Sequence, residues 1–380
     1  MKKNIFKNPG VQALIASLLC IVLGLLIGYV VLLFINPSGA GEAIVAVVKN
    51  FLNSSRANLR LKNLGNTLVK TAPLLMCSLS VLFAYKVGLF NIGAAGQFVV
   101  GSCACLISSL GWGWSWLPCL LFTVLVGAVY GAVVGLLKSY CNVNEVISGI
   151  MLNWIGLYTT NMILNSVKEP TSPYTLHMTS EAPQALLPSL GMGELFSGNR
   201  YVTIAIPLAV VLAIVIMVLL DKTKLGYELK ATGNNKNAAK YAGMAEKRNI
   251  ILTLAIAGAL AALGGAFLYQ TDYEQWSVTQ SSVPGMGFNG IAAAFLGGLH
   301  PVGAIFSSYF IQHITSGGAY VDLTKYSSQI SDLISSIIIY LCGFVLFIKY
   351  AMNKSIAKRE EKQAQKAKLA SDTGKGGDGK

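Results

Sequence analysis

The sequence predicts an all-α polytopic membrane protein: about ten transmembrane helices in two pseudo-repeated halves, with short broken helices in each half. Three observations support this fold class. Of the 380 residues, 54% are hydrophobic and only 12% are charged, whereas about a quarter of a soluble domain is charged. Long apolar runs recur along the chain. Glycine-rich segments interrupt this pattern at matching positions in the two halves, which indicates helices that break inside the membrane.

The first apolar run covers residues 11–35 and contains no charged residue. A helix crosses a bilayer with about 20 apolar residues, whereas the apolar core of a secretory signal has roughly 7–15. We therefore expect this run to be a span that is retained. Further apolar runs follow at 67–87, 93–110, 116–137, 146–165, 202–220, 250–269, 288–298, 301–316 and 330–349.

The basic residues predict the orientation of these spans. Lysines crowd residues 1–7, and seven basic residues lie in the loop at about 221–250, so both regions are predicted to be cytoplasmic. The linker at about 166–201 has few basic residues and is predicted to be an external loop. A break at Leu299–Pro301 makes two short spans of the region 288–316, because proline cannot continue the preceding helix. Both termini are then cytoplasmic.

One segment does not fit this charge distribution. Residues 36–63 carry Lys49, Arg56, Arg60 and Lys62, yet the order of the spans places them outside. The positive-inside rule describes a bias along the whole chain, so this exception does not change the predicted topology.

The chain divides into a transmembrane domain, 1–349, and a basic cytoplasmic tail, 350–380, that is predicted to be disordered from its composition. The tail supplies much of the net charge of +13. A basic protein can also bind nucleic acid, but a solvated tail that fixes topology is the favoured explanation. The seven cysteines are scattered and form no C-x-x-C pair, so we expect small buried hydrophobes, with no disulfide and no metal site.

The stretch "GLFNIGAAGQ", residues 88–97, is too rich in glycine and amides for a plain spanning helix. Irregular backbone survives in a membrane only where protein buries it or where it lines a wet cavity. One interpretation is a broken helix that lines a substrate path with Phe90, Asn91, Gly93 and Gln97. The alternative is close helix packing through glycine, with two amides whose hydrogen bonds are satisfied.

A second stretch, "GMGFNGIAAAFLGG", occupies residues 285–298 and also contains Phe-Asn in a glycine- and alanine-rich context, at Phe288 and Asn289. Interrupted segments at corresponding positions of two halves indicate the central site of a transporter. We therefore predict that Phe288 and Asn289 also line the path. Chance similarity between two segments of this composition is the alternative.

Two further stretches carry candidate residues. In the loop "LGYELKATGNNKNAAKYAGM", residues 225–244, the small side chains of Ala238, Ala239 and Ala242 are predicted to form one face of a short helix that ends at Gly243. This face would allow a partner to dock closely, although a solvated loop is the commoner fate of such a segment. Asn153 lies deep in the fifth run and needs a partner, either on another helix or in the path.

These four stretches together resemble the permease subunits of bacterial ABC importers for nucleosides, within the larger group of ribose-type and branched-chain amino-acid permeases. The similarity is carried by "GLFNIGAAGQ", "NEVISGIMLNWI", "GYELKATGNNKNAAKYAGM" and "GFNGIAAAFLGGLHPVGA", and it covers roughly residues 64–349. In this family an acidic residue is common where this chain has Ala95, and arginine is usual where it has Lys230. A charge-dependent role at 95, and a bidentate contact at 230, are therefore not expected.

The resemblance implies partners outside this chain. These are a second permease subunit that is either a copy or a paralogue, cytoplasmic ATPases that bind ATP and magnesium, and an external lipoprotein that captures the substrate. It also implies a multi-pass protein of the bacterial cell membrane, and it implies that the cytoplasmic loop docks into the ATPase. The coupling residues are then Gly226, Tyr227, Glu228, Lys230, Gly233, Asn234, Ala238, Ala239, Ala242 and Gly243.

The absence of certain motifs argues against other classes of protein, namely enzymes and ion-coupled carriers. No G-x-x-x-x-G-K-[ST], H-E-x-x-H or G-x-S-x-G occurs, so we expect a non-catalytic transport subunit without a cofactor or a metal of its own. An ion-coupled carrier places ionisable residues in its spans. Few such residues besides Lys70 lie inside these runs, which argues against an ion-coupled carrier. Amide side chains suit a neutral polar solute, a nucleoside or alternatively a simple sugar such as ribose or galactose.

Overall fold

The structure is a computed structural model that describes residues 9–355 except 328, 346 and 349. It is all-α, as predicted: no strand occurs among these residues, only two isolated β-bridges. The first half contains α1 (Pro9–Ile35), α2 (Ala40–Lys49), α3 (Ala57–Lys86), α4 (Ala94–Leu106), α5 (Trp116–Cys141) and α6 (Glu145–Leu164). The short helices α7 (Met178–Glu181) and α8 (Met192–Leu195) follow in the long linker.

The second half contains α9 (Ala205–Lys222), α10 (Lys224–Asn234), α11 (Lys236–Tyr241), α12 (Glu246–Tyr269), α13 (Gly285–Leu296), α14 (Pro301–Gly317) and α15 (Ile330–Cys342). Every apolar run that the sequence identifies coincides with one of these helices or with a helix of the first half. Six helices are long and apolar enough to cross a membrane, namely α1, α3, α5, α9 and α12, together with the helical stretch that begins with α4 and ends at Gly111. The helices α13 and α15 are apolar but shorter.

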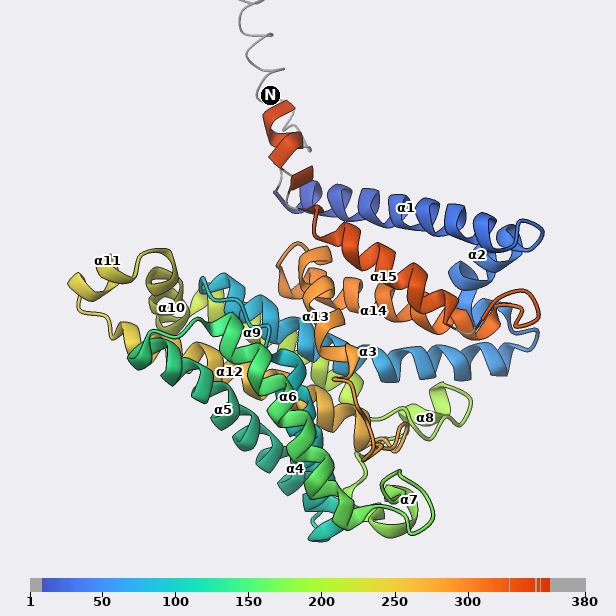
Figure 1. Cartoon of the computed structure of the whole chain (residues 1–380), viewed down its shortest axis with the longest axis horizontal. Helices are drawn as coiled ribbons and strands as arrows, with labels where there is room; N and C mark the ends of the chain where they lie inside the picture. The colour runs from blue at the N-terminus through green and yellow to red at the C-terminus, as the bar shows by residue number, and fades with distance from the viewer. Residues whose placement is uncertain (1–8, 328, 346, 349, 356–380) are drawn as a thin grey trace, which may run out of the picture.

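The helices α3 and α12 form the buried centre of the molecule and pack against each other. Each is followed by a short helix, α4 in the first half and α13 in the second, so the order of a long buried helix and a short one repeats. Helix α5 packs along α12, and α1 packs along α15 on the opposite side (Figure 1). A Cβ at Gly131 of α5 would lie 2.1 Å from the carbonyl oxygen of Leu254, so α5 and α12 approach each other through glycine.

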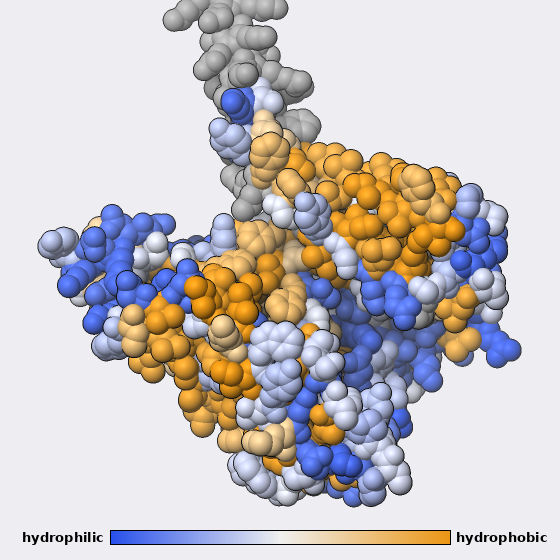
Figure 2. Space-filling view, in the orientation of Figure 1, coloured by the Kyte–Doolittle hydropathy of each residue, from blue (hydrophilic) through white to orange (hydrophobic). Residues whose placement is uncertain are grey.

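The outer surface has the distribution that a bilayer demands. Hydrophobic residues cover the outer faces near α1 and α5, and hydrophilic residues gather at the ends that carry α10, α11 and α2 (Figure 2). Paler and hydrophilic surface lies between the two hydrophobic areas. The chain is therefore a multi-pass membrane protein.

The break predicted at Leu299–Pro301 is present. Helix α13 ends at Leu296 and α14 begins at Pro301, with His300 as its N-cap. The imidazole Nδ1 of His300 accepts a hydrogen bond from the backbone N–H of Val302 at 3.3 Å, and Leu299 adopts a positive φ of 56°. Proline at the first helical position and a capping side chain before it start α14 in the expected way.

The expected interruption at Phe288–Asn289 is wrong, because both residues lie in the regular helix α13. The irregular backbone precedes them, between α12 and α13. A glycine inside a helix costs roughly 1 kcal/mol, but it also lets another backbone approach, and Gly287 and Gly290 both make such contacts. Close packing thus explains this glycine-rich segment better than unwinding does.

The predicted disordered tail, 350–380, falls almost wholly outside the described residues, and residues 351–355 are helical. The predicted cytoplasmic position of the two termini stays a prediction, as do the domain boundary at 349 and the external position of the linker at about 166–201.

Candidate functional site

A turn of irregular backbone separates α3 from α4 and lies within the "GLFNIGAAGQ" stretch. Gly88 has a φ of 77°, which a residue with a Cβ rarely adopts. Its N–H donates to the carbonyl of Tyr85, and the N–H of Leu89 donates to the carbonyl of Ala84, both at 3.0 Å. Two of the last carbonyls of α3 are satisfied in this way. The predicted break is therefore confirmed at residues 87–93.

Asn91 and Gln97 close this turn with a pair of amide hydrogen bonds. The Asn91 Nδ2 donates to the Gln97 Oε1 at 2.8 Å, and the Gln97 Nε2 donates to the Asn91 Oδ1 at 3.3 Å. The Asn91 Nδ2 also donates to the Ser80 Oγ at 2.9 Å. Only 2% of Asn91 and 1% of Gln97 is exposed. In this conformation the two amides therefore satisfy each other and hold α3, the turn and α4 together.

Asn153 of α6 holds the same turn from the other side. Its Oδ1 accepts from the backbone N–H of Gly96 at 2.7 Å, and its Nδ2 donates to the carbonyl of Ile92 at 3.1 Å. Gly96 lies in the first turn of α4, where backbone N–H groups lack partners within the helix. A single buried amide thus supplies one acceptor and one donor to the break, which is the helix–helix role that the sequence favoured.

The second half meets the first at the start of α4. A Cβ at Gly287 of α13 would lie 2.3 Å from the Cα and 2.8 Å from the Cβ of Ala95. A Cβ at Gly290 would lie 2.6 Å from the Cβ of Cys77 in α3. The glycine-rich segments of the two halves therefore touch, and the small side chain at position 95 is what allows this contact. An acidic side chain at 95 would displace α13.

Phe288 and Asn289 lie next to this contact, and both reach the surface. Phe288 is 39% exposed and Asn289 is partly exposed. Among the residues that the structure describes, no hydrogen bond is made by the Asn289 side chain. Of the seven candidate path residues, Phe90 is half-buried, and Asn91, Gly93, Gln97 and Asn153 are buried. Asn289 is thus the one amide among them that is free to bind a solute.

The predicted coupling segment forms α10 and α11. Helix α10 begins behind Thr223, whose hydroxyl accepts from the N–H of Gly226 at 3.0 Å, and Gly226 packs against the end of α9. The Lys230 ammonium is 3.1 Å from the Asp221 carboxylate. The outward surface carries the remaining candidates: Tyr227, Asn234, Ala238, Ala242 and Gly243 are exposed, and Glu228 is half-buried.

The predicted short helix is present as α11, followed by Gly243 with a φ of 77°. Its small-residue face is only partly as expected. Ala238 and Ala242 point outward, but Ala239 is 3% exposed and contributes to the packing of α11. Helical geometry explains the difference, because adjacent residues are about 100° apart around the axis. Ala238 and Ala239 therefore face in different directions.

The sequence does not predict that the coupling segment touches the first break. A Cβ at Gly233 of α10 would lie 2.0 Å from the carbonyl oxygen of Val87, and a Cβ at Gly88 would lie 2.8 Å from the carbonyl oxygen of Gly233. The end of α10 and the turn after α3 are in backbone contact. The end of α10 therefore lies directly against the turn that Asn91, Gln97 and Asn153 hold.

Metal-ligating and charged groups are sparse around this site. The described part of the chain contains no group of three or more His, Cys, Asp or Glu side chains that could hold a metal ion. Lys70, a basic residue near the middle of α3, is 2.7 Å from the Glu274 carboxylate. The site is therefore built from amides, glycines and aromatic rings.

A broken-helix bundle with short helices that meet between two halves is the architecture of a membrane transport protein. Comparison with known families agrees. Residues 63–343 match the family described as branched-chain amino acid transport system / permease component. The chain belongs to this family and is a permease component of a transport system.

Several characterised relatives match over most of their length. The nucleoside ABC transporter permease protein NupB of Lactococcus lactis is 30% identical over 376 residues, covering 94% of this chain and 98% of the relative. The guanosine ABC transporter permease protein NupP of Bacillus subtilis is 29% identical, covering 90% and 96%. The glucose ABC transporter permease protein TsgB13 of Haloferax volcanii is 26% identical, covering 78% and 80%. No solved structure matches the chain significantly.

The Asn91–Gln97 pair should show thermodynamic coupling. Replacing either residue by leucine leaves a buried amide unpaired, so each single variant should lose about 1–3 kcal/mol of unfolding free energy. The double variant, Asn91→Leu with Gln97→Leu, should lose less than the sum, because the orphaned group is removed as well. Titration with dodecyl sulfate in mixed micelles measures the unfolding free energy of the unmodified chain, the two single variants and the double variant. Additive losses would show that the two side chains do not depend on each other.

Gly233 should tolerate no side chain. Valine at this position forces the carbonyl of Val87 away, and overpacking of this kind costs about 1–3 kcal/mol. We expect Gly233→Val to lower uptake by about tenfold while the ATPase still co-purifies with the protein. Gly41→Val is the matched control, because Gly41 is exposed in α2 and a Cβ there would meet no atom within 4 Å. Normal uptake by the Gly233→Val protein would show that the contact with the turn does not transmit movement.

Proposed function

We propose that this chain is the transmembrane permease subunit of an ABC importer for nucleosides. The match to NupB carries the proposal, because it spans nearly the whole of both proteins. The relative NupP is named for the nucleoside guanosine, and it extends this match to a second organism. A simple sugar is the second candidate, supported by the more distant glucose permease protein TsgB13.

The geometry supports a neutral, polar solute. The side chains nearest the meeting point of the two halves are amides, an aromatic ring and small residues. Of these, Phe288 and Asn289 are open to a solute. An amide can donate and accept hydrogen bonds without attracting a charged competitor, and an aromatic ring can stack on a base. The path runs along the paler and hydrophilic surface between the two hydrophobic areas of Figure 2.

The power for transport comes from other subunits. Cytoplasmic ATPases that bind ATP and magnesium dock on the exposed part of α10 and α11, and an external lipoprotein delivers the substrate. Closure of the ATPases moves α10, and the Gly233–Val87 contact carries this movement to the turn before α4. The chain itself then needs neither a cofactor nor a catalytic group, and both of its termini are cytoplasmic.

The second permease subunit is a paralogue. Two different nucleoside permease proteins of Lactococcus lactis, NupB and NupC, match this chain, and so do two guanosine permease proteins of Bacillus subtilis, NupP and NupQ. This chain matches NupB and NupP over the greater length. A heteromeric pair is the arrangement that this pattern favours.

Reconstitution tests the proposal. The chain is co-expressed with the ATPase, the lipoprotein and the permease paralogue encoded beside it, and proteoliposomes loaded with ATP are given labelled guanosine, uridine, ribose or glucose. ATP-dependent uptake of nucleosides, with no uptake of the two sugars, supports the proposal. Uptake of a sugar alone would favour the second candidate. Uptake driven by an ion gradient without the ATPase would assign the chain to ion-coupled carriers.

Asn289 should matter for transport and not for folding. Asn289→Leu removes an amide of similar size, and one lost hydrogen bond to the solute, worth about 0.5–1.5 kcal/mol, should lower nucleoside uptake about two- to tenfold. The melting temperature in detergent should stay unchanged, because the side chain has no partner among the described residues. Asn165→Leu is the control, because Asn165 is exposed just after α6 and outside the segment that docks on the ATPase. A lower melting temperature with normal uptake would make Asn289 a structural residue.

A further inference from the structure

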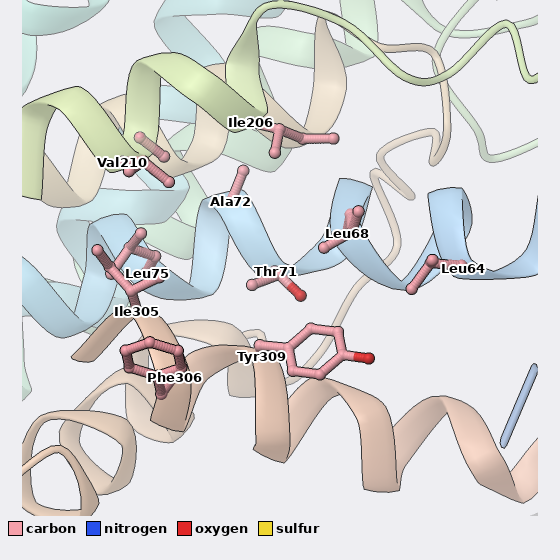
Figure 3. A pocket seen from close by; sticks show the side chains of 11 residues that line it. Leu64, Leu68, Thr71, Ala72, Leu75, Ile206, Val210, Ile305, Phe306 and Tyr309 are labelled. Carbon is pink, nitrogen blue, oxygen red and sulfur yellow. The ribbon is translucent and has the colours of Figure 1, made fainter. Parts of the chain in front are cut away.

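A hydrophobic fissure lies on the far side of α3 from α13, between α9 and α14. Its volume is about 420 Å³ and its lining is almost entirely apolar. Figure 3 shows Leu64, Leu68 and Leu75 of α3 along its floor, with Ile206 and Val210 of α9 on one side and Phe306 of α14 on the other. Its length follows α3 over three turns, from Leu64 to Leu75.

The fissure opens between two faces that are hydrophobic and unpartnered. Phe306 at its edge is 70% exposed, and the neighbouring face of α9 exposes Val211, Val215 and Val218. Helix α9 is one of the helices long and apolar enough to cross a membrane, and α14 packs against it and against α3. Water would have almost no polar partner in such a fissure, whereas the hydrocarbon that surrounds these faces fills it without cost. An acyl chain is therefore the occupant whose chemistry suits this lining.

Basic residues lie at one end of the fissure. Arg60 precedes Leu64 by four residues, so it lies on the same face of α3 and about 6 Å further along the helix axis. Its Nε donates to the carbonyl of Ser54 at 2.6 Å, and the guanidinium is exposed. Three more exposed cations lie near this end of α3: Lys49 ends α2, Arg56 immediately precedes α3, and Lys62 lies in the second turn of α3.

These cations have no acidic partners. In the part of the chain that the structure describes, no carboxylate lies within 4.0 Å of the charged groups of Lys49, Arg56, Arg60 or Lys62. Lys325, nearby in the fold, differs, because its ammonium is 2.9 Å from the Glu42 carboxylate. The uncompensated charge belongs to the segment that the sequence predicts on the external side against the usual charge bias.

We propose that the fissure and Arg60 together form a binding site for one anionic phospholipid. An acyl chain lies along α3 in the fissure, and the lipid phosphate is held by the guanidinium of Arg60 at the level of the membrane surface. Arginine suits this role, because its planar fork binds phosphate oxygens in pairs. The phosphate also explains why four cations are tolerated at this end of α3. The inference depends on the fold in the membrane and not on the transported substrate.

The acidic face of an external protein is another possible partner for the same cations. It would neutralise Arg60, but it cannot fill a fissure that continues for three helical turns into the hydrophobic part of the molecule. A lipid accounts for the fissure and the cations at once. The following experiment separates the two.

Photocrosslinking tests the site. The full chain is reconstituted into phosphatidylcholine vesicles that contain a phosphatidylglycerol with a diazirine on its acyl chain, or the matching phosphatidylcholine probe. After irradiation, labelled peptides are mapped by mass spectrometry. We expect adducts on α3, α9 and α14 around the fissure, from the anionic probe more than from the zwitterionic one, and competition by unlabelled phosphatidylglycerol. Neither ATP nor a nucleoside is present, so the result is independent of the proposed transport function.

Two pairs of variants locate the site. Arg60→Gln should lower labelling by the anionic probe about tenfold, because the charge-assisted hydrogen bonds from the guanidinium to the phosphate are lost. Lys62→Gln removes the same charge from another face of α3 and should not lower it. Val210→Phe fills the fissure and should abolish labelling there, whereas Val215→Phe, on the exposed face of α9, should not.

Three results would overturn the proposal. Equal labelling by the two probes would show that the anionic headgroup is not recognised. Equal losses of labelling in Arg60→Gln and Lys62→Gln would show that only the general surface charge attracts the lipid. Unchanged labelling in Arg60→Gln would show that the guanidinium does not hold the lipid phosphate, and would leave an external acidic protein as the partner of these cations. Competition on the unmodified chain gives a result even if a variant fails to fold.

Discussion

A helix that breaks where protein excludes water leaves backbone N–H and C=O groups unpaired, and each of them needs a partner. This constraint organises the whole site. The turn between α3 and α4 meets it with two carbonyls of α3 that accept from Gly88 and Leu89, and with the Asn153 side chain, which bonds Gly96 and Ile92. The Asn91–Gln97 pair then fixes the turn to α4. Buried amides are therefore the structural elements that make the break possible.

The same turn is where three distant parts of the chain meet. Gly233 brings the cytoplasmic segment against it, and Gly287 brings the second half against the first residues of α4. Both contacts join backbone to backbone, which only residues without a large side chain allow. The coupling segment and the glycine-rich segment of the second half thus contact neighbouring parts of one small and well-packed region. In the proposed mechanism, this proximity is the short route from the ATPase to the solute path.

The sequence predicts the elements well and the contacts poorly. Runs of apolar residues locate the helices, and Pro301 locates a break, because hydrophobic length and a missing N–H act locally. The partners of Asn91 and Asn153 depend on which helices become neighbours, and composition does not contain that information. The pair Phe288–Asn289 has the same sequence as Phe90–Asn91, yet Phe288–Asn289 is helical and Phe90–Asn91 is not. Glycine permits both unwinding and close packing, so tertiary contacts decide between them.

Hydrogen–deuterium exchange in the assembled importer tests the central claim, that movement of α10 reaches the turn at residues 87–93. Exchange is compared between the nucleotide-free complex and the complex trapped with a non-hydrolysable ATP analogue. The account predicts that amide exchange in 87–93 changes together with exchange in α10. A change in α10 while 87–93 exchanges at the same rate in both states would contradict it.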